Sequence, residues 1–540
     1  MYGQVQEDQT HRQKILISDP GVKQLLERLV NKEGDLDFGG LYACVRNPWL
    51  WERSANVNEQ YSKLIKFASH LDHARKVCRM NAFIHVHGND LPSWHSWARR
   101  LWDLHAHRVV PYHFALRWDN TDEEFDGWSC YSAVSHSWTS SMADNHTQHF
   151  STPVNGHEWP VPLPIGVTLE AVRNELLNLG EEYVWLDVVC LRQSGGPGEA
   201  LQADEWAVDV PTIGTIYQMA RKVIRYYNGL GVAFECRGWT GDRHWLRRVW
   251  TIQEIHPNSV TAGLPEGLTA EDFHHLKSEE HGRPFNHYLG PILELEDKME
   301  WFGLARLEDL FQALKELRGR VATKRIDKIA AFGSLLHGLV RIPLYEADMD
   351  LERAWALLLQ CMHPYMLAGF LWRISIPGNG RYKWRPSWTQ LMHELTEESY
   401  IRDEAYLQNP ALKDNFIISK QCRLLKGNAW LTLDHTDNSR PMAKVHYSDA
   451  VVPMLEFSTT LGSGQYCKEG AVRLVGNHVH NEGRHLWGRI VPGFVCLMVC
   501  KEVEISQGEI GYEKITVVPA KDLHPLRFKA EFEKTDITFV

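Results

Sequence analysis

The sequence predicts an α/β protein, in which a parallel sheet domain is flanked by helices and followed by a β-rich C-terminal region. Between residues 109 and 258, short apolar segments alternate with amphipathic helical patterns. An alternating order of strands and helices predicts parallel strands joined by crossover helices. Beyond residue 415, short alternating segments broken by Gly and Asn indicate a small β-rich domain.

We expect three or four domains from the length of 540 residues, at about 100 to 200 residues per domain. The regions are a mixed, partly helical segment (1–108), the α/β domain (109–258), a mainly helical region (259–400) and a β-rich C-terminal domain (401–540). In the first region, helical spacing extends over Val22–Leu29 and over Trp94–Arg108. In the third, it extends over Leu307–Arg320 and Asp327–Leu339.

The composition argues against a protein that binds nucleic acid by neutralising phosphates. The chain has 58 Lys and Arg against 68 Asp and Glu, a formal net charge of −10, whereas such binders usually carry a basic excess. A hydrophobic fraction of 44% with 23% charged residues is typical of globular proteins that bury sizeable cores. The 21 Trp residues therefore predict mainly core packing.

Neither a membrane segment nor a metal site is expected. The polar start of the chain lacks the apolar core of a secretory signal, and the run Ile490–Cys500 is too short to span a bilayer. The ten Cys residues are scattered without a CxxC pair, and the His residues near position 150 show no metal-ligand spacing. We expect a reduced protein of the cytoplasm.

One helix separates the first two strands of the α/β domain. Cys130–Val134 predicts the first strand, which leads into a polar loop. Thr168 caps a helix that Gly180 ends. Tyr183–Leu191 is a nearly continuous apolar run, typical of a strand buried on both faces, and the Gly-rich sequence SGGPG follows it.

Two further helices and a third strand complete the domain. Asp209 and Pro211 mark the start of the second helix, because Pro is favoured in the first turn. Val223–Tyr227 predicts the third strand, and His244–Ile255 predicts the third helix.

Polar residues follow each predicted strand, at the edge of the sheet where open parallel sheets bind ligands. Ser135, His136 and Trp138 follow the first strand, and Arg192 and Gln193 follow the second. Ser135 and His136 point to opposite faces of an extended chain, which argues against a pair of nucleophile and base. We therefore assign them, with the other residues of this edge, to ligand binding.

The third predicted helix carries a candidate acid. Arg247, Trp250 and Glu254 share one face of this helix, and an opposite apolar face of Trp245, Val249 and Ile252 packs on the sheet. Such spacing places a carboxylate beside a ring that can stack on a ligand. A solvated helix face with an ion pair has the same spacing, so both interpretations stay open.

Four blocks of the sequence resemble successive blocks of the fungal heterokaryon incompatibility (HET) domain, of the basidiomycete type. The blocks are CYSAVSHSW, EEYVWLDVVCLRQ, DEWAVDVPTIGTIYQMA and RRVWTIQE; flanking segments such as RLWDLHAHRVVP, NGHEWPVPLP, ATKRIDKIAAFGSLL and WRPSW also agree. The resemblance covers residues 97–390. The first block departs from the pattern, with His136 where many relatives carry Tyr, Ser137 where they carry Cys or an aliphatic residue, and Thr139 in place of Gly.

The resemblance implies a role in non-self recognition, in which HET domains trigger cell death when incompatible hyphae fuse. HET domains are held to be similar to Toll/interleukin-1 receptor (TIR) domains, which have a flavodoxin-like fold. In catalytic TIR domains a Glu in a WxxxE-like helix acts on NAD, and Trp250 with Glu254 occupies that pattern here. The implied reaction cleaves the bond between nicotinamide and ribose, through a transition state that a carboxylate stabilises.

These implications assign a role to each candidate residue. Glu254 is the expected catalytic group; Trp138 or Trp250 stacks on a ring of the ligand, and Arg192 or Arg247 holds the pyrophosphate. Asp187, which interrupts an apolar run, either contacts the ligand or bonds to neighbouring backbone or Arg groups. NAD enters as a substrate rather than a cofactor.

Two other functions stay open: a non-enzymatic signalling module that oligomerises with itself or with an incompatibility partner, and a nucleotide sensor without turnover.

Overall fold

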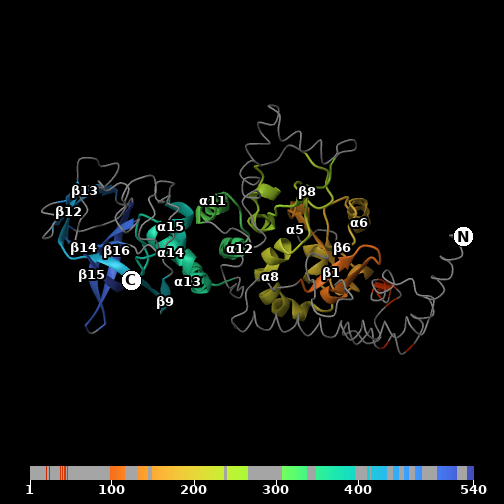
Figure 1. Cartoon of the computed structure of the whole chain (residues 1–540). Coiled ribbons are helices and arrows are strands. Elements are labelled where there is room, and N and C mark those ends of the chain that lie inside the picture. Colours follow the sequence, from red (N-terminus) through yellow and green to blue (C-terminus); the bar gives the residue numbers. More distant parts are fainter. Residues whose placement is uncertain are drawn as a thin grey trace, which may run out of the picture. The chain divides into compact units, whose positions relative to one another are not determined.

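The structure is a computed structural model of the whole chain (Figure 1). It describes residues 98–115, 131–143, 149–235, 240–264, 307–336 and 348–395, the segments 410–413, 415–434, 442–448, 455–460, 469–476, 496–506, 508–519 and 532–540, and isolated positions before residue 47. The chain forms two compact units, Met1–Ala305 with Lys315–Asp348, and Arg306–Leu314 with Met349–Val540. The helix expected over Val22–Leu29 falls outside the described residues, apart from one helical position.

A six-stranded sheet forms the centre of the first unit, in the order β2-β1-β6-β3-β7-β8. The strands are β1 (Arg100–Asp103), β2 (Arg108–Pro111), β3 (Ser132–His136), β6 (Tyr183–Trp185), β7 (Val223–Tyr226) and β8 (Ser259–Thr261). The neighbours β6, β3, β7 and β8 are parallel, whereas β1 is antiparallel to both β2 and β6. The parallel sheet is confirmed for four strands, and the antiparallel hairpin makes the sheet mixed.

The hairpin β1–β2 replaces the helix that was predicted over Trp94–Arg108. Residues 98–108 of this segment are described, and they form β1, a tight turn with His107 at φ 53°, and the start of β2. Leu101 and Trp102 are both 0% exposed although neighbouring side chains of a strand point to opposite faces. A strand buried on both faces has no period of two, so its apolar pattern resembles that of a helix.

The helix after Thr168 is confirmed as α6 (Leu169–Asn178). The Thr168 hydroxyl accepts a hydrogen bond from the Ala171 amide at 3.1 Å, and Gly180, at φ 78°, follows the end of the helix. These signals are local in sequence, which explains why they predict the element well.

Two further predictions were wrong in extent. The apolar run Tyr183–Leu191 is strand only over β6, and it continues as the short helix α7 (Asp187–Cys190). The next helix, α8 (Gln202–Gln218), begins before the predicted start at Asp209 and contains Pro211. Ion pairs of Glu205 with two Arg side chains stabilise its first turns, and an apolar pattern does not reveal such pairs.

Shorter elements connect these strands and helices. They are η2 (Tyr112–Phe114), α5 (Ser140–Ala143), β4 (His149–Phe150), η3 (Pro153–Asn155), β5 (Val161–Pro162) and η4 (Glu199–Leu201). The strands β4 and β5 pair as a small antiparallel hairpin.

The predicted helices of the third region are confirmed as α11 (Leu307–Arg318) and α12 (Asp327–Leu335). The second unit adds α13 (Leu351–Cys361), α14 (Pro364–Trp372) and α15 (Trp388–His393). No helix among the described residues is long and apolar enough to cross a membrane.

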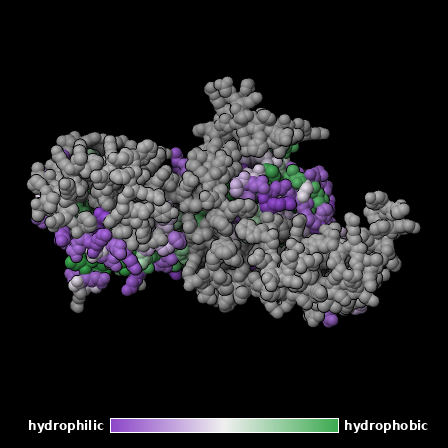
Figure 2. All heavy atoms as spheres, viewed as in Figure 1, coloured by the Kyte–Doolittle hydropathy of each residue, from purple (hydrophilic) through white to green (hydrophobic). Residues whose placement is uncertain are grey.

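The second unit also contains the predicted β-rich region, a nine-stranded sheet in which most pairs are antiparallel. Its strands are β9 (Ala411–Lys413), β10 (Phe416–Leu425), β11 (Asn428–Asp434), β12 (Met442–Ser448), β13 (Leu455–Thr460), β14 (Gly470–Gly476), β15 (Cys496–Ser506), β16 (Glu509–Pro519) and β17 (Phe532–Phe539). Figure 2 shows hydrophilic and hydrophobic residues intermixed over the surface of β15 and β16. Cys496 and Cys500 lie in the buried half of β15.

Contact between α8 and α12 depends on Gly214. A Cβ atom at this position would lie 2.5 Å from Cβ of Ser334 on α12. Gly→Ala in a helix usually stabilises by about 0.8 to 1.0 kcal/mol, but overpacking a core costs about 1 to 3 kcal/mol. We therefore expect Gly214→Ala to lower the melting temperature in thermal unfolding. Combining it with Ser334→Gly should restore part of the loss, and a double variant no better than Gly214→Ala would contradict this explanation.

Candidate functional site

The carboxyl end of β3 is where the connections of the sheet change direction. From β3 the chain goes to β6 on one side, and it then crosses to β7 on the other side. Ligands of open α/β sheets bind outside the carboxyl ends of the strands at such a switch point. Ser135 and His136 end β3, so the topology places both at this position.

Two short 3₁₀ turns replace the helix predicted over His244–Ile255. They are η5 (Trp245–Arg247) and η6 (Trp250–Glu254), separated by an extended Arg248 with φ −79° and ψ 136°. Val321 pairs with this break: its amide donates to the Arg247 carbonyl, and its carbonyl accepts from the amide of the residue after Arg248. Hydrogen bonds to Val321, which is distant in sequence, thus replace the hydrogen bonds that a continuous helix would make here.

This change buries the candidate acid. The prediction placed Glu254 opposite the apolar face of a helix, but only 7% of its surface is exposed. The residues expected on the apolar face are buried as predicted, with Trp245 and Ile252 at 0% exposure. The turn η6 packs against β3, α8 and α12, so both of its sides are covered.

Three side chains form a hydrogen-bonded chain at the switch point. Nε1 of Trp245 lies 2.7 Å from Oγ of Ser135, which lies 2.5 Å from Oε2 of Glu254. An indole N–H can only donate, so Oγ of Ser135 accepts this bond and its own proton is directed to the carboxylate. Ser135 therefore orients Glu254 and favours its ionised form.

The pKa of Glu254 is raised to about 7. Burial is the largest cause; Ser135 lowers the pKa through its hydrogen bond, the charge of Asp187 raises it, and the charges of His136 and Arg225 lower it. At neutral pH the carboxyl group populates both protonation states, which is what a group that accepts or donates a proton in catalysis requires.

Asp187 joins two other predicted residues. Its Oδ1 lies 2.7 Å from Nε2 of His136, and its Oδ2 accepts from Nε1 of Trp138 at 3.0 Å. Burial lowers the pKa of His136, but Asp187 reverses this and the net shift is upward. Burial raises the pKa of Asp187, but His136 and Trp138 reverse this and the net shift is downward. The two groups lie within ion-pair distance, and each pKa shift favours the charged form of its group.

The remaining candidates lie around these two groups. Gln193 donates from Nε2 to the Leu191 carbonyl at 2.9 Å and to the Asp187 carbonyl at 3.4 Å. Arg247 is the last residue of η5 and Trp250 is the first residue of η6, and both side chains are partly exposed. Because Asp187 and His136 shift the pKa of Glu254, the ion pair and the Ser135–Glu254 bond belong to one electrostatic site.

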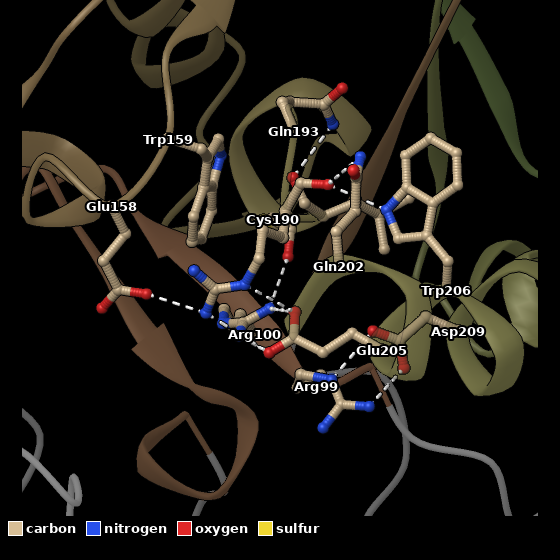
Figure 3. A network of polar contacts seen from close by, with 12 residues as sticks. Arg99, Arg100, Glu158, Trp159, Cys190, Gln193, Gln202, Glu205, Trp206 and Asp209 are labelled. Atoms are coloured by element: carbon tan, nitrogen blue, oxygen red, sulfur yellow. Dashed lines mark hydrogen bonds and ion pairs between the residues drawn. The ribbon is translucent and has the colours of Figure 1, made fainter. Parts of the chain in front are cut away.

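Arg192 belongs to a second network, with Glu158 and Glu205, which are labelled in Figure 3. It donates from Nη2 to Glu158 at 2.9 Å and pairs with Glu205, which also accepts from Arg100 at 2.6 and 3.0 Å. The guanidinium carbons of Arg100 and Arg192 lie 5.2 and 5.1 Å from the ring centroid of Trp159. Carboxylates of the chain thus compensate the charge of Arg192, and its expected contact with a pyrophosphate stays a prediction.

Loss of Arg192 should destabilise the domain. Its side chain is only 4% exposed, and removing one partner of a buried ion pair costs about 3 to 5 kcal/mol. Because Glu205 keeps Arg100, we expect Arg192→Met to lower the free energy of unfolding by about 3 kcal/mol, the lower end of that range. Denaturant unfolding measures this change, with the exposed Arg243→Met as control. Equal stability of the two variants would show that the network is energetically neutral.

Three residues of the site were not predicted: Trp245, Arg225 and Arg320. Trp245 was expected only as a core residue, although its indole N–H is also a hydrogen-bond donor. Arg225 stands inside the apolar strand β7, and a charged residue in a buried strand is a usable signal. Arg320 follows α11, far from the α/β segment, and nothing in its sequence context points to the site.

One family model matches the chain. Residues 131–238 match the model described as "Heterokaryon incompatibility protein (HET)". The chain carries a HET domain. The match runs from before β3 to beyond β7, so Ser135, His136 and Asp187 of the site belong to the HET segment, whereas Glu254 lies C-terminal to it. No curated protein and no solved structure matches this HET-domain protein.

Proposed function

We propose that this HET-domain protein is a cytoplasmic effector of non-self recognition and cell death that hydrolyses NAD at the nicotinamide–ribose bond. The observation that carries the proposal is the carboxyl group of Glu254, with a pKa of about 7, hydrogen-bonded to Ser135 at the switch point of the sheet. A carboxylate at such a position is suited to stabilising positive charge on a ribose.

The order of the parallel strands supports a relation to TIR domains. Numbered along the chain, β3, β6, β7 and β8 are strands 1 to 4 of the parallel part, and their order in the sheet is 2-1-3-4. Flavodoxin-like sheets have the order 2-1-3-4-5 and bind their ligand at the same switch point. Trp250 and Glu254 also occupy the WxxxE pattern of catalytic TIR domains.

The proposed reaction breaks the bond between C1′ of the ribose and the nicotinamide nitrogen. The electron pair of this bond leaves with nicotinamide, and the ribose becomes oxocarbenium-like. Ionised Glu254 stabilises that charge, water then attacks C1′, and its proton passes to the carboxylate or to solvent. The products are nicotinamide, ADP-ribose and a proton. Ser135 holds the carboxylate, and His136, Asp187 and Gln193 shape the opposite side of the strand end.

A non-enzymatic signalling module is the competing function. Ser135 is 0% exposed, and its bond to Glu254 links η6 to β3 as a structural contact would. In that case the chain acts by assembling with itself or with a partner. A nucleotide sensor without turnover is the third alternative.

Incubation of the full-length protein with NAD separates these functions. Nicotinamide release is measured by chromatography, in dilute protein and in a crowded solution that promotes assembly. Release in either condition supports hydrolysis. Calorimetric binding of ADP-ribose without release supports a sensor, and neither release nor binding in any state supports the assembling module.

A further inference from the structure

Two buried Arg side chains contact the indole of Trp245. The guanidinium carbon of Arg225 lies 4.5 Å from the ring centroid, and that of Arg320 lies 5.5 Å from it. Arg225 is 2% exposed and Arg320 is 3% exposed. Because Trp245 donates to Ser135, this cationic cluster directly adjoins the Ser135–Glu254 bond.

Arg320 has hydrogen-bond donors to spare. Its Nη1 donates to the Arg248 carbonyl at 2.9 Å and to Oγ1 of Thr251 at 2.6 Å. Its Nε and Nη2 are buried, and among the described residues no group accepts from either; the same holds for Nε of Arg247. Leaving such a group unpaired costs about 1 to 3 kcal/mol, more when it is charged.

Other cations also act on Arg320. Burial and the charges of Arg225 and Arg247 lower the pKa of Arg320 to about 10, against the opposing charges of Glu316 and Glu254. Burial and Arg247 likewise lower the pKa of Lys328.

We propose that Arg320 and Arg247 form a binding subsite for the phosphoryl groups of a nucleotide-type ligand beside Glu254. A guanidinium group presents a planar fork of donors that matches the oxygens of a phosphate. Arg247 is the partly exposed member, so it is the group that first meets a ligand from solvent. Arg192 also has one buried donor without an acceptor, Nη1, but its Nε and Nη2 already donate to Glu205 and Glu158.

This subsite deepens the proposed function, because the pyrophosphate of NAD is one ligand of the stated class. Binding itself, however, requires no bond cleavage. Adjacent residues offer a matched pair of variants: Arg247→Gln removes a charge from the cluster, whereas Arg248→Gln removes the same charge from a side chain that donates to Thr323.

Calorimetry with the full-length protein tests the subsite, using inorganic pyrophosphate, ADP-ribose and adenosine as probes. We expect both phosphorylated probes to bind and adenosine not to bind. Arg247→Gln should weaken binding about tenfold, which is about 1.4 kcal/mol, and Arg248→Gln should leave it unchanged. Arg320→Gln should abolish binding, with thermal unfolding as the check that it folds; only a folded Arg320→Gln preparation is scored.

Several results would overturn the subsite: no binding of either phosphorylated probe, equal binding of adenosine and ADP-ribose, or equal weakening by Arg247→Gln and Arg248→Gln. The hydrolytic proposal fails separately. Glu254→Gln should retain pyrophosphate binding, so binding without nicotinamide release in the wild-type protein would refute hydrolysis alone. Release without pyrophosphate binding would refute the subsite alone.

Discussion

Glu254→Gln is expected to lower nicotinamide release from NAD by about 100-fold or more, because removing one electrostatic stabiliser of a transition state typically costs that much. The amide has the same shape as the carboxyl group, and its oxygen accepts the hydrogen bond from Ser135. It carries no charge and takes up no proton. Chromatographic measurement of nicotinamide from the purified variant tests this result.

The same substitution should stabilise the fold at alkaline pH. Since the pKa of Glu254 is raised from 4.5 to about 7, the native state binds more protons than the unfolded state between these values. Native stability therefore falls as pH rises from 4.5 to about 7, by up to about 3 kcal/mol. The Gln side chain does not ionise, so the variant does not lose stability in this way. The free energy of unfolding of Glu254→Gln, relative to wild type, should therefore be higher at pH 8 than at pH 5.

The exposed Glu170 supplies a matched control. Glu170→Gln should change neither nicotinamide release nor the pH dependence of unfolding. Unchanged release in Glu254→Gln would remove this residue from catalysis, and the competing signalling function would then explain its burial. Lost release with an unchanged pH profile would instead show that the pKa of Glu254 is not raised in the folded protein.

Local signals made parts of the fold predictable. The strand β7 and the helix α6 follow from apolar spacing, a capping Thr and a terminating Gly, all within a few residues of the element. The hairpin β1–β2 and the turns η5 and η6 could not be predicted from such local signals. Burial on two faces hides the strand period in β1, and pairing with Val321 breaks the helix that the spacing of His244–Ile255 favours.

Individual residues of the site could be predicted from the sequence, but the contacts between them could not. Sequence topology placed Ser135 at the carboxyl end of β3, and the family resemblance singled out Glu254. Their hydrogen bond joins residues 119 positions apart, and no local pattern reports such a contact. The same holds for Arg192, whose predicted ligand role competes with carboxylates that tertiary folding brings to it.

The second large effect concerns Asp187→Asn, which should lower the free energy of unfolding by about 3 kcal/mol near pH 6. The carboxylate accepts from three donors: Nε2 of His136, Nε1 of Trp138 and the amide of Val188. An Asn side chain has one acceptor atom, so its NH₂ group would face one of these donors. It also removes the charge that raises the pKa of His136, whose side chain is 1% exposed.

The pH dependence distinguishes loss of the ion pair from a general packing defect. The pKa of His136 is raised above 6.5 in the folded protein, so the pair stabilises fully below 6.5 and loses its effect as pH rises through the raised value. The pKa of Asp187 is lowered below 3.8 in the folded protein, so the stabilisation is also lost as pH falls below 3.8 and through the lowered pKa. Denaturant unfolding of wild type and Asp187→Asn should therefore differ most between these limits and least at alkaline pH. With the exposed Asp204→Asn as control, a difference that is constant with pH would mean that His136 is neutral and that shape, not charge, holds Asp187 in place.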